Sequence, residues 1–115
     1  MTPSDAALPI EIDCRAVQAA RTAGEDFLLV DCREPDEYAL VRIEGAVLIP
    51  IREFPQRAEE FESHRAGRIV VHCHHGGRSL KAANWLRQNG FPQAQSMAGG
   101  IDAWAVEVDP ALGRY

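Results

Sequence analysis

Short apolar segments that end in polar residues alternate with helix-forming segments along the chain. The two clearest are Phe27–Asp31, which is a continuous apolar run up to its final aspartate, and Arg68–Cys73, which has the apolar centre IVV; both are typical of strands buried on both faces. Weaker strand candidates occupy residues 9–13, 46–50 and 94–100. Alternation of strands with helices predicts a mainly parallel sheet with helices on both faces. The expected fold class is therefore α/β, in the form of one small domain.

The segments between these strands contain residues that begin and end helices. Asp13 is placed to cap a first helix that stops at Gly24, and Pro35 suits the first turn of a short second helix. The charged segment Arg52–Arg65 is interpreted as a polar-faced, solvated helix, with a break near Pro55 left open. Helices are predicted over residues 14–24, 33–41, 52–65, 79–90 and 100–108.

The length of 115 residues suits a single domain over residues 1–115, with a core at about 9–106 and short tails. A chain of this size can bury enough apolar surface to form one core without disulfides or a metal. Ligands of parallel sheets bind beyond the carboxyl ends of the strands. The segments LVDCRE and VVHCHHGGRS both place polar residues there, so they are expected to flank one pocket.

Charge and cysteine content limit the classes of function. The net charge of −5 and the absence of a stripe of Lys and Arg argue against nucleic-acid binding. No apolar run is long enough to span a bilayer, and the first ten residues lack the features of a signal peptide. The three cysteines are odd in number and form no C-x-x-C pair, which argues against a disulfide framework. These features predict a reduced, cytoplasmic protein that binds neither nucleic acid nor membrane.

The segment IVVHCHHGGRS, residues 69–79, has the highest density of reactive side chains. Cys73 ends an apolar strand and begins a glycine-rich turn into a helix, and such a turn points backbone N–H groups into a concave anion site. These donors also favour a thiolate and can lower a cysteine pKa from about 8.5 to roughly 3.5–7.5. Gly76 and Gly77 let the turn curl, and Arg78 adds a cation. Cys73 is therefore predicted to be a nucleophile beside a site for an anionic substrate.

Two other interpretations apply to the same segment. An inert, packed Cys73 fits the apolar strand before it but not the polar turn after it. A metal site at residues 72–75 conflicts with the alternating directions of strand side chains and with the spaced ligand pairs typical of zinc. No metal is expected. His72 is predicted to pack in the core, while His74 and His75 line the turn and assist anion binding.

The segment VVHCHHGGRS resembles the active-site loop of single-domain rhodaneses, the thiosulfate sulfurtransferases. Three other segments resemble motifs of this family and occur in the family's order: LLVDCREPDEY, IEGAVLIP and MAGGIDAW. Arg42 stands where the second of these motifs usually has histidine. The resemblance spans Pro9 to Trp104 and implies a small rhodanese-like domain with a mainly parallel central sheet.

Cysteine phosphatases are the main competing family, because their nucleophile also lies on a strand–loop–helix turn with an arginine. Their motif has five residues between cysteine and arginine, whereas four separate Cys73 from Arg78. In the rhodanese family, a six-residue loop counted from the cysteine through the arginine accompanies sulfur transfer. A tighter ring of N–H groups suits one terminal sulfur atom, so sulfur transfer is favoured over phosphate hydrolysis.

The resemblance implies that Cys73 attacks a sulfane donor such as thiosulfate and becomes a persulfide, which an acceptor then consumes in a ping-pong cycle. It implies neither a cofactor nor a metal. Asp31 and Arg33 are implied to support the loop, although a plain strand-end role for Asp31 is an equal interpretation. The implied substrate-binding residues form the loop itself: His74, His75, Gly76, Gly77, Arg78 and Ser79.

Three functions remain open at this point. The first is an enzyme that moves sulfur from a small anionic donor to a thiol or cyanide. The second is a persulfide carrier or sensor without turnover, whose partner is a protein of a sulfur relay. The third, less favoured, is a phosphatase-like enzyme. Cys32 is interpreted as a packing residue, and whether it resolves the Cys73 persulfide is left open.

Overall fold

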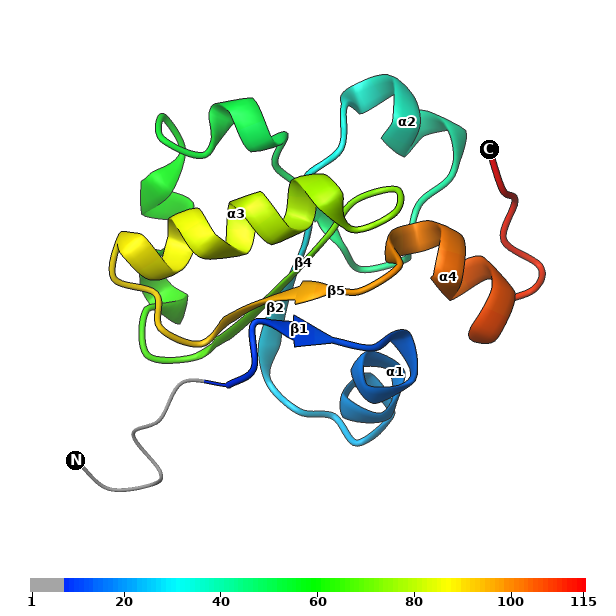
Figure 1. The fold of residues 1–115 in the computed structure, drawn as a ribbon, viewed down its shortest axis with the longest axis horizontal. Helices are drawn as coiled ribbons and strands as arrows, with labels where there is room; N and C mark the ends of the chain where they lie inside the picture. Colours follow the sequence, from blue (N-terminus) through cyan, green and yellow to red (C-terminus); the bar gives the residue numbers. More distant parts are fainter. Residues whose placement is uncertain (1–7) are drawn as a thin grey trace.

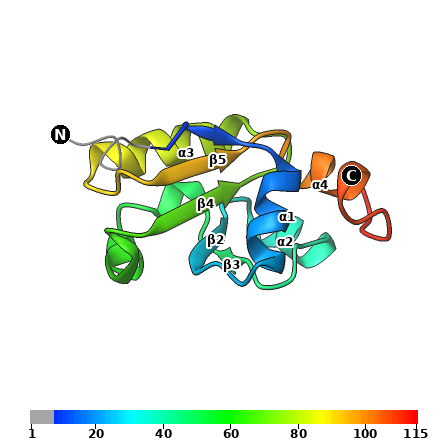
Figure 2. The same cartoon turned by 90° about the horizontal axis from the view of Figure 1, so that it is seen from below.

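Five short strands form one parallel sheet in the computed structural model, which describes residues 8–115 (Figure 1). Residues 1–7 of the predicted N-terminal tail lie outside this range. The strand order is β1-β5-β4-β2-β3, so β4 lies between β5 and β2 (Figure 2). The strands are β1 (Glu11–Ile12), β2 (Phe27–Asp31), β3 (Val47–Leu48), β4 (Arg68–His72) and β5 (Ala94–Met97).

The central pair, β2 and β4, fixes where the polar strand ends meet. Their register runs from Phe27 opposite Arg68 to Asp31 opposite His72, over the full length of both strands. Because the two strands are parallel and in register, both polar segments that follow them leave the sheet at the same edge. The register of β2 and β4 therefore brings these two segments to the same edge of the sheet, as predicted.

Helices cover both faces of the sheet, as predicted. α3 (Gly77–Gln88) lies on one face, and α1 (Cys14–Thr22) and α4 (Gly100–Glu107) contact each other on the opposite face (Figure 1). Each face has its own buried apolar cluster. The α3 cluster includes Val30, Val71, Ala83 and Leu86, and the α1–α4 cluster includes Val17, Leu29, Val70 and Trp104. This alternation of β2 and β4 side chains between two cores explains why the centres of both strands are continuously apolar.

Local sequence signals place the helix ends well. Asp13 caps α1, because its Oδ1 accepts a hydrogen bond from the Ala16 N–H at 2.7 Å. Pro35 is the first residue of α2 (Pro35–Leu40), whose capping box joins Glu34 and Glu37. The three weaker strand candidates form shorter strands than predicted; β5, for example, ends at Met97, shortly before Gly99 and Gly100 take left-handed backbone angles.

The helical segment predicted over Arg52–Arg65 is broken around Pro55, the position at which the sequence left a break open, but it is not a wholly solvated helix. The segment forms two 3₁₀ helices, η2 (Ile51–Glu53) and η3 (Ala58–His64). Pro55 lacks the N–H that a continuous helix needs, and Phe54 and Phe61 are both buried, with ring centroids 5.0 Å apart. The segment is therefore a polar outer layer fixed to the α3 core by two aromatic side chains.

A search of the described residues finds no helix that is both long enough and apolar enough to cross a membrane.

Replacing Phe61 with alanine tests this aromatic anchor. Phe61 has no exposed surface, so Phe61→Ala should lower the free energy of unfolding by about 3–5 kcal/mol. Urea denaturation followed by circular dichroism measures the change. The exposed neighbour Glu59 provides the matched control, and Glu59→Ala should leave the midpoint nearly unchanged. Equal effects of the two substitutions would contradict the anchoring role.

Candidate active site

The Cys73 sulfur lies where β4 turns into α3 and is surrounded by hydrogen-bond donors. The N–H of Gly76 is 3.0 Å from Sγ, the N–H of Ser79 is 3.4 Å away, and the Ser79 hydroxyl oxygen is 3.5 Å away. Gly76 has a φ of +113°, which glycine adopts without strain, and this conformation turns its N–H inward. The turn predicted from the sequence thus directs two backbone N–H groups at the cysteine sulfur, and its binding of an anionic substrate stays a prediction.

These contacts lower the pKa of the Cys73 thiol to about 4. The largest contribution is a hydrogen bond from the Cys32 thiol, followed among the lowering contacts by the Ser79 hydroxyl and the two backbone N–H groups, while burial opposes them. The same contact with Cys73 raises the pKa of Cys32. The proton shared by the pair therefore stays on Cys32, because only Cys73 is surrounded by amide donors. The pair of shifts therefore favours the thiolate on Cys73 and the protonated thiol on Cys32.

The N-terminus of α4 supports the loop from behind. The N–H of Ile101 donates to the Cys73 carbonyl at 2.9 Å, and the N–H of Asp102 donates to the His74 carbonyl at 3.1 Å. A Cβ atom at Gly100 would lie 2.5 Å from the Cys73 carbonyl oxygen and closer still to that of His74. Only glycine permits this approach, which gives a physical reason for the second glycine of MAGGIDAW.

Asp31 and Arg33 form a buried ion pair close to the loop but do not touch the Cys73 sulfur. Arg33 Nη2 lies 2.7 Å from Asp31 Oδ2, and neither side chain has exposed surface. Arg33 also donates to the carbonyls of Glu37 and Val41, at the end of α2. His72, fully buried, lies with its Nε2 3.7 Å from Asp31. The pair therefore holds α2 against the end of β2, and a role in supporting the loop stays a prediction.

Arg78 is more tightly paired than the sequence suggested. Its two terminal nitrogens contact the two Glu37 carboxylate oxygens at 2.7 and 3.0 Å, and its side chain is 38% exposed. This contact lowers the pKa of Glu37 to about 2, and the Tyr115 hydroxyl donates to the same carboxylate at 2.8 Å. The positive charge predicted to face an anionic substrate is thus partly neutralised. The remaining N–H groups of the guanidinium are still donors.

The two loop histidines lie at the rim. His75 is exposed, and the His74 ring stacks between His75 and Tyr115 with centroid distances of 3.9 and 3.8 Å. His74, His75 and Asp102 also bring potential metal ligands within 4.8 Å of one another. The Asp102 carboxylate is however occupied by Arg114, at 2.8 and 3.1 Å. The sequence-based expectation that this loop binds no metal stays a prediction.

Sequence reasoning missed several residues around the loop. Ser96 on β5 lies 2.7 Å from the Ser79 hydroxyl, and Glu37 pairs with Arg78 while accepting a hydrogen bond from the Tyr115 hydroxyl. The one available signal was a serine within the buried strand β5, where a hydroxyl needs a partner. Glu37 was visible only as part of a family motif, because its contact with Arg78 joins distant segments.

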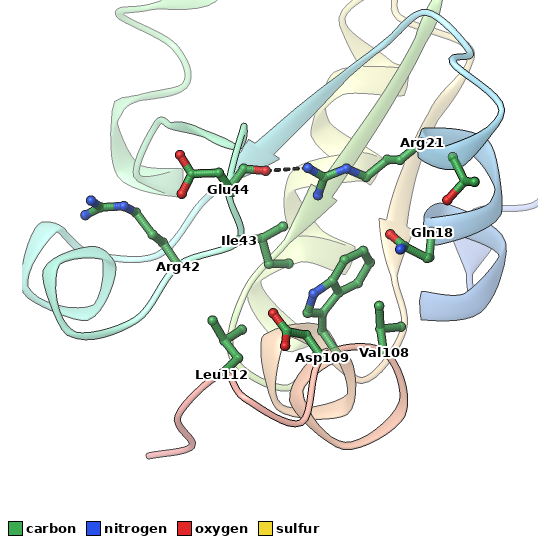
Figure 3. Close-up of a pocket in the computed structure, with 10 residues that line it drawn as sticks. Gln18, Arg21, Arg42, Ile43, Glu44, Val108, Asp109 and Leu112 are labelled. Atoms are coloured by element: carbon green, nitrogen blue, oxygen red, sulfur yellow. Dashed lines mark hydrogen bonds between the residues drawn. The ribbon is translucent and has the colours of Figure 1, made fainter.

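A separate cavity of about 540 Å³ lies away from the loop, between α1, residues 42–44 and the segment after α4 (Figure 3). Arg21 spans it to the Glu44 carbonyl, and its guanidinium lies over the Trp104 ring at 5.7 Å. Cys73 does not line this cavity. The cavity and the Cys73 loop are therefore two separate places on the domain.

A parallel sheet covered on both faces, with a cysteine at the donor-rich turn from its central strand into a helix, defines an α/β domain whose loop stabilises a cysteine anion. Comparison with known families agrees with this class. The model of the rhodanese-like domain family matches residues 14–107, and the chain therefore belongs to this family. The fold class and the family resemblance drawn from the sequence are both confirmed.

Individual relatives cover the chain to different extents. A sulfurtransferase of Allochromatium vinosum is 37% identical over 95 residues, which form 83% of this chain and 87% of that protein. The chloroplastic rhodanese-like/PpiC domain-containing protein 12 of Arabidopsis thaliana is 36% identical over 79% of this chain, which spans 31% of that longer protein. A rhodanese-like domain protein from Staphylococcus aureus gives a TM-score of 0.79 at 26% identity, with coverage of 93% of this chain and 99% of that one.

The titration of Cys73 tests the electrostatics of the loop. Its folded-state pKa is depressed, so the thiolate should persist as the pH falls from neutrality and should disappear only near pH 4. The difference in ultraviolet thiolate absorbance between the wild type and Cys73→Ser measures this titration. Cys14 does not interfere, because burial above all raises its pKa to about 11. A midpoint near the ordinary value of about 8.5 would show that the loop does not stabilise the anion.

Proposed function

We propose that the protein is a sulfurtransferase that moves a sulfane sulfur from thiosulfate, or from a persulfide donor, through a persulfide on Cys73. The observation that supports this most directly is the arrangement of the Gly76 and Ser79 N–H groups around the Cys73 sulfur, which lowers the pKa of this thiol. Membership of the rhodanese-like family and similarity to a named sulfurtransferase support the same reaction class.

The first half-reaction is a displacement at sulfur. The Cys73 thiolate attacks the outer sulfur of thiosulfate, a new S–S bond forms on Cys73, and the S–S bond of the donor breaks. The electron pair of the broken bond leaves with sulfite, so no oxidant or reductant is consumed. The negative charge then lies on the terminal sulfur of the persulfide. In this proposal the backbone N–H groups of loop residues 74–79 stabilise that charge.

The second half-reaction restores the thiolate. An acceptor thiolate or cyanide attacks the terminal sulfur, and the electron pair of the persulfide bond returns to Cys73. Stabilisation of the Cys73 anion by the loop makes it a good leaving group in this step. In this scheme Arg78, His74 and His75 contact the oxygens of the donor at the rim, and Asp31 and Arg33 position the loop.

A second candidate is a persulfide carrier that receives sulfur from a protein partner and turns thiosulfate over slowly. One observation favours it: the chain matches a segment of a much longer rhodanese-like protein. The same thiolate and the same loop would serve this function. Rapid uptake of sulfur from a protein persulfide, combined with slow thiocyanate formation from thiosulfate, would identify it.

Replacement of the nucleophile tests the proposal. After incubation with thiosulfate, the wild type should gain the mass of one sulfur atom at Cys73 and should form thiocyanate when cyanide is added. Cys73→Ser should do neither, because a serine hydroxyl is not ionised at neutral pH, whereas Cys14→Ser should retain both properties. Intact-protein and peptide mass spectrometry locate the sulfur. Retention of the added sulfur by Cys73→Ser, or Cys73-dependent hydrolysis of an aryl phosphate, would overturn the assignment.

The contact between Arg78 and Glu37 gives a test of donor binding. If Glu37 screens the guanidinium, Glu37→Gln should lower the KM for thiosulfate by up to about fivefold, because a partly exposed ion pair is worth up to about 1 kcal/mol. Arg78→Ala should raise the KM, and Glu59→Gln provides an exposed control. Steady-state kinetics measure these changes. A higher KM in Glu37→Gln would mean that the carboxylate positions Arg78 for binding rather than competing with the donor.

A further inference from the structure

Cys32 and Cys73 lie next to each other at the ends of two neighbouring strands. They follow directly on the last register pair of β2 and β4, Asp31 and His72. The strands are still joined at this point, because the Cys32 N–H donates to the His72 carbonyl at 3.0 Å. Neighbouring strands are about 4.8 Å apart. Disulfides join residues whose Cα atoms are about 4.4–6.8 Å apart, so this backbone spacing admits a bond between the two sulfurs.

The two side chains also share one environment. Both are buried in the apolar cluster beneath α3, where Cys32 has no exposed surface and Cys73 is 1% exposed. The neighbouring Cys32 thiol is also the largest influence that lowers the pKa of the Cys73 thiol. The loop N–H groups of Gly76 and Ser79 reach the Cys73 sulfur from a different element. Cys73 therefore has amide donors from the loop around its sulfur and a second thiol beside it on the adjacent strand.

Cys14 occupies a different position. It lies in the cluster between the sheet and the α1–α4 layer, on the opposite face from Cys32 and Cys73. Its sulfur contacts the carbonyls of Ala98 and Gly100 at 3.7 and 3.8 Å, not another thiol. The chain therefore contains one cysteine placed to react with Cys73 and one equally buried cysteine that is not.

We propose that Cys32 is a resolving thiol, which attacks the Cys73 persulfide when no acceptor arrives, forms a Cys32–Cys73 disulfide and releases the transferred sulfur as hydrosulfide. This inference rests on the proposed persulfide of Cys73. It gives Cys32 a catalytic role in a second outcome of the same cycle, the reductive release of sulfane sulfur.

The step balances without an external oxidant. The sulfur of Cys32 attacks Sγ of Cys73, the bond between Sγ and the terminal sulfur breaks, and its electron pair leaves with the terminal sulfur. The proton of the Cys32 thiol passes to that sulfur, so the products are a protein disulfide and hydrosulfide. The disulfide is oxidised by two electrons relative to the two thiols, as the persulfide was, so no net oxidation takes place in this step. A dithiol reductant then restores both cysteines by thiol–disulfide exchange.

The experiment compares the wild type with Cys32→Ala and with the control Cys14→Ala. Each protein is reduced, loaded with thiosulfate, freed of small molecules and incubated without an acceptor. Intact mass, peptide mapping and a hydrosulfide assay are recorded over time. The wild type and Cys14→Ala should first gain one sulfur atom and then release one hydrosulfide per chain, ending two hydrogen atoms lighter than the reduced protein, with Cys32 linked to Cys73. Cys32→Ala should gain the sulfur and keep it, and it should form no disulfide with Cys73.

Each failure has a distinct meaning. If the wild type keeps its added sulfur as long as Cys32→Ala does and releases no hydrosulfide, Cys32 is a packing residue and the inference is wrong. If no protein gains sulfur, the proposed donor reaction fails, and the resolving step fails with it. Should Cys32→Ala not take up sulfur because the loop is disturbed, Cys32→Ser provides a more conservative substitution. The peptide map of the wild type still decides whether the disulfide forms.

Discussion

The burial of an ionised sulfur is the constraint on which the rest of this domain depends. An unpaired buried charge is unfavourable by several kcal/mol, so a thiolate at the end of β4 requires donors on all sides. The turn at Gly76, the start of α3 and the Cys32 thiol provide them. Ser96 in turn contacts the Ser79 hydroxyl from β5. Three neighbouring strands and one helix are thus arranged around a single atom.

A second layer of charges fixes the segments around this atom. The buried Asp31–Arg33 pair joins the end of β2 to α2, and Glu37 of α2 reaches Arg78 at the start of α3. Because Glu37 also accepts the hydroxyl of Tyr115, the chain that follows α4 belongs to the same network. A substitution in this layer therefore acts on the loop through the position of a helix, without touching the sulfur.

Much of the fold and the centre of the site could be predicted from the sequence. Phe27–Asp31 and the helix after Cys73 were found because they are set by local signals, namely apolar runs, a cap and a glycine-rich turn. The burial of Phe61 within Arg52–Arg65 could not be predicted, because the charges beside it are close in sequence while the core that buries it is distant. The contacts of Glu37 with Arg78 and of Cys32 with Cys73 depend on strand register and helix placement, which periodicity does not determine.

The close approach of α4 has a consequence for how the site can change. The first N–H groups of α4 are bonded to the carbonyls of Cys73 and His74, and Gly100 leaves no free space between helix and loop. An insertion in the loop would push these carbonyls against the helix, so a larger ring requires that α4 withdraw. The width of this loop is therefore set jointly by two segments that are distant in the sequence. A loop wide enough for a bulkier oxyanion would need changes in the loop and at the start of α4 together. A longer loop grafted without a change in α4 should not fit this scaffold.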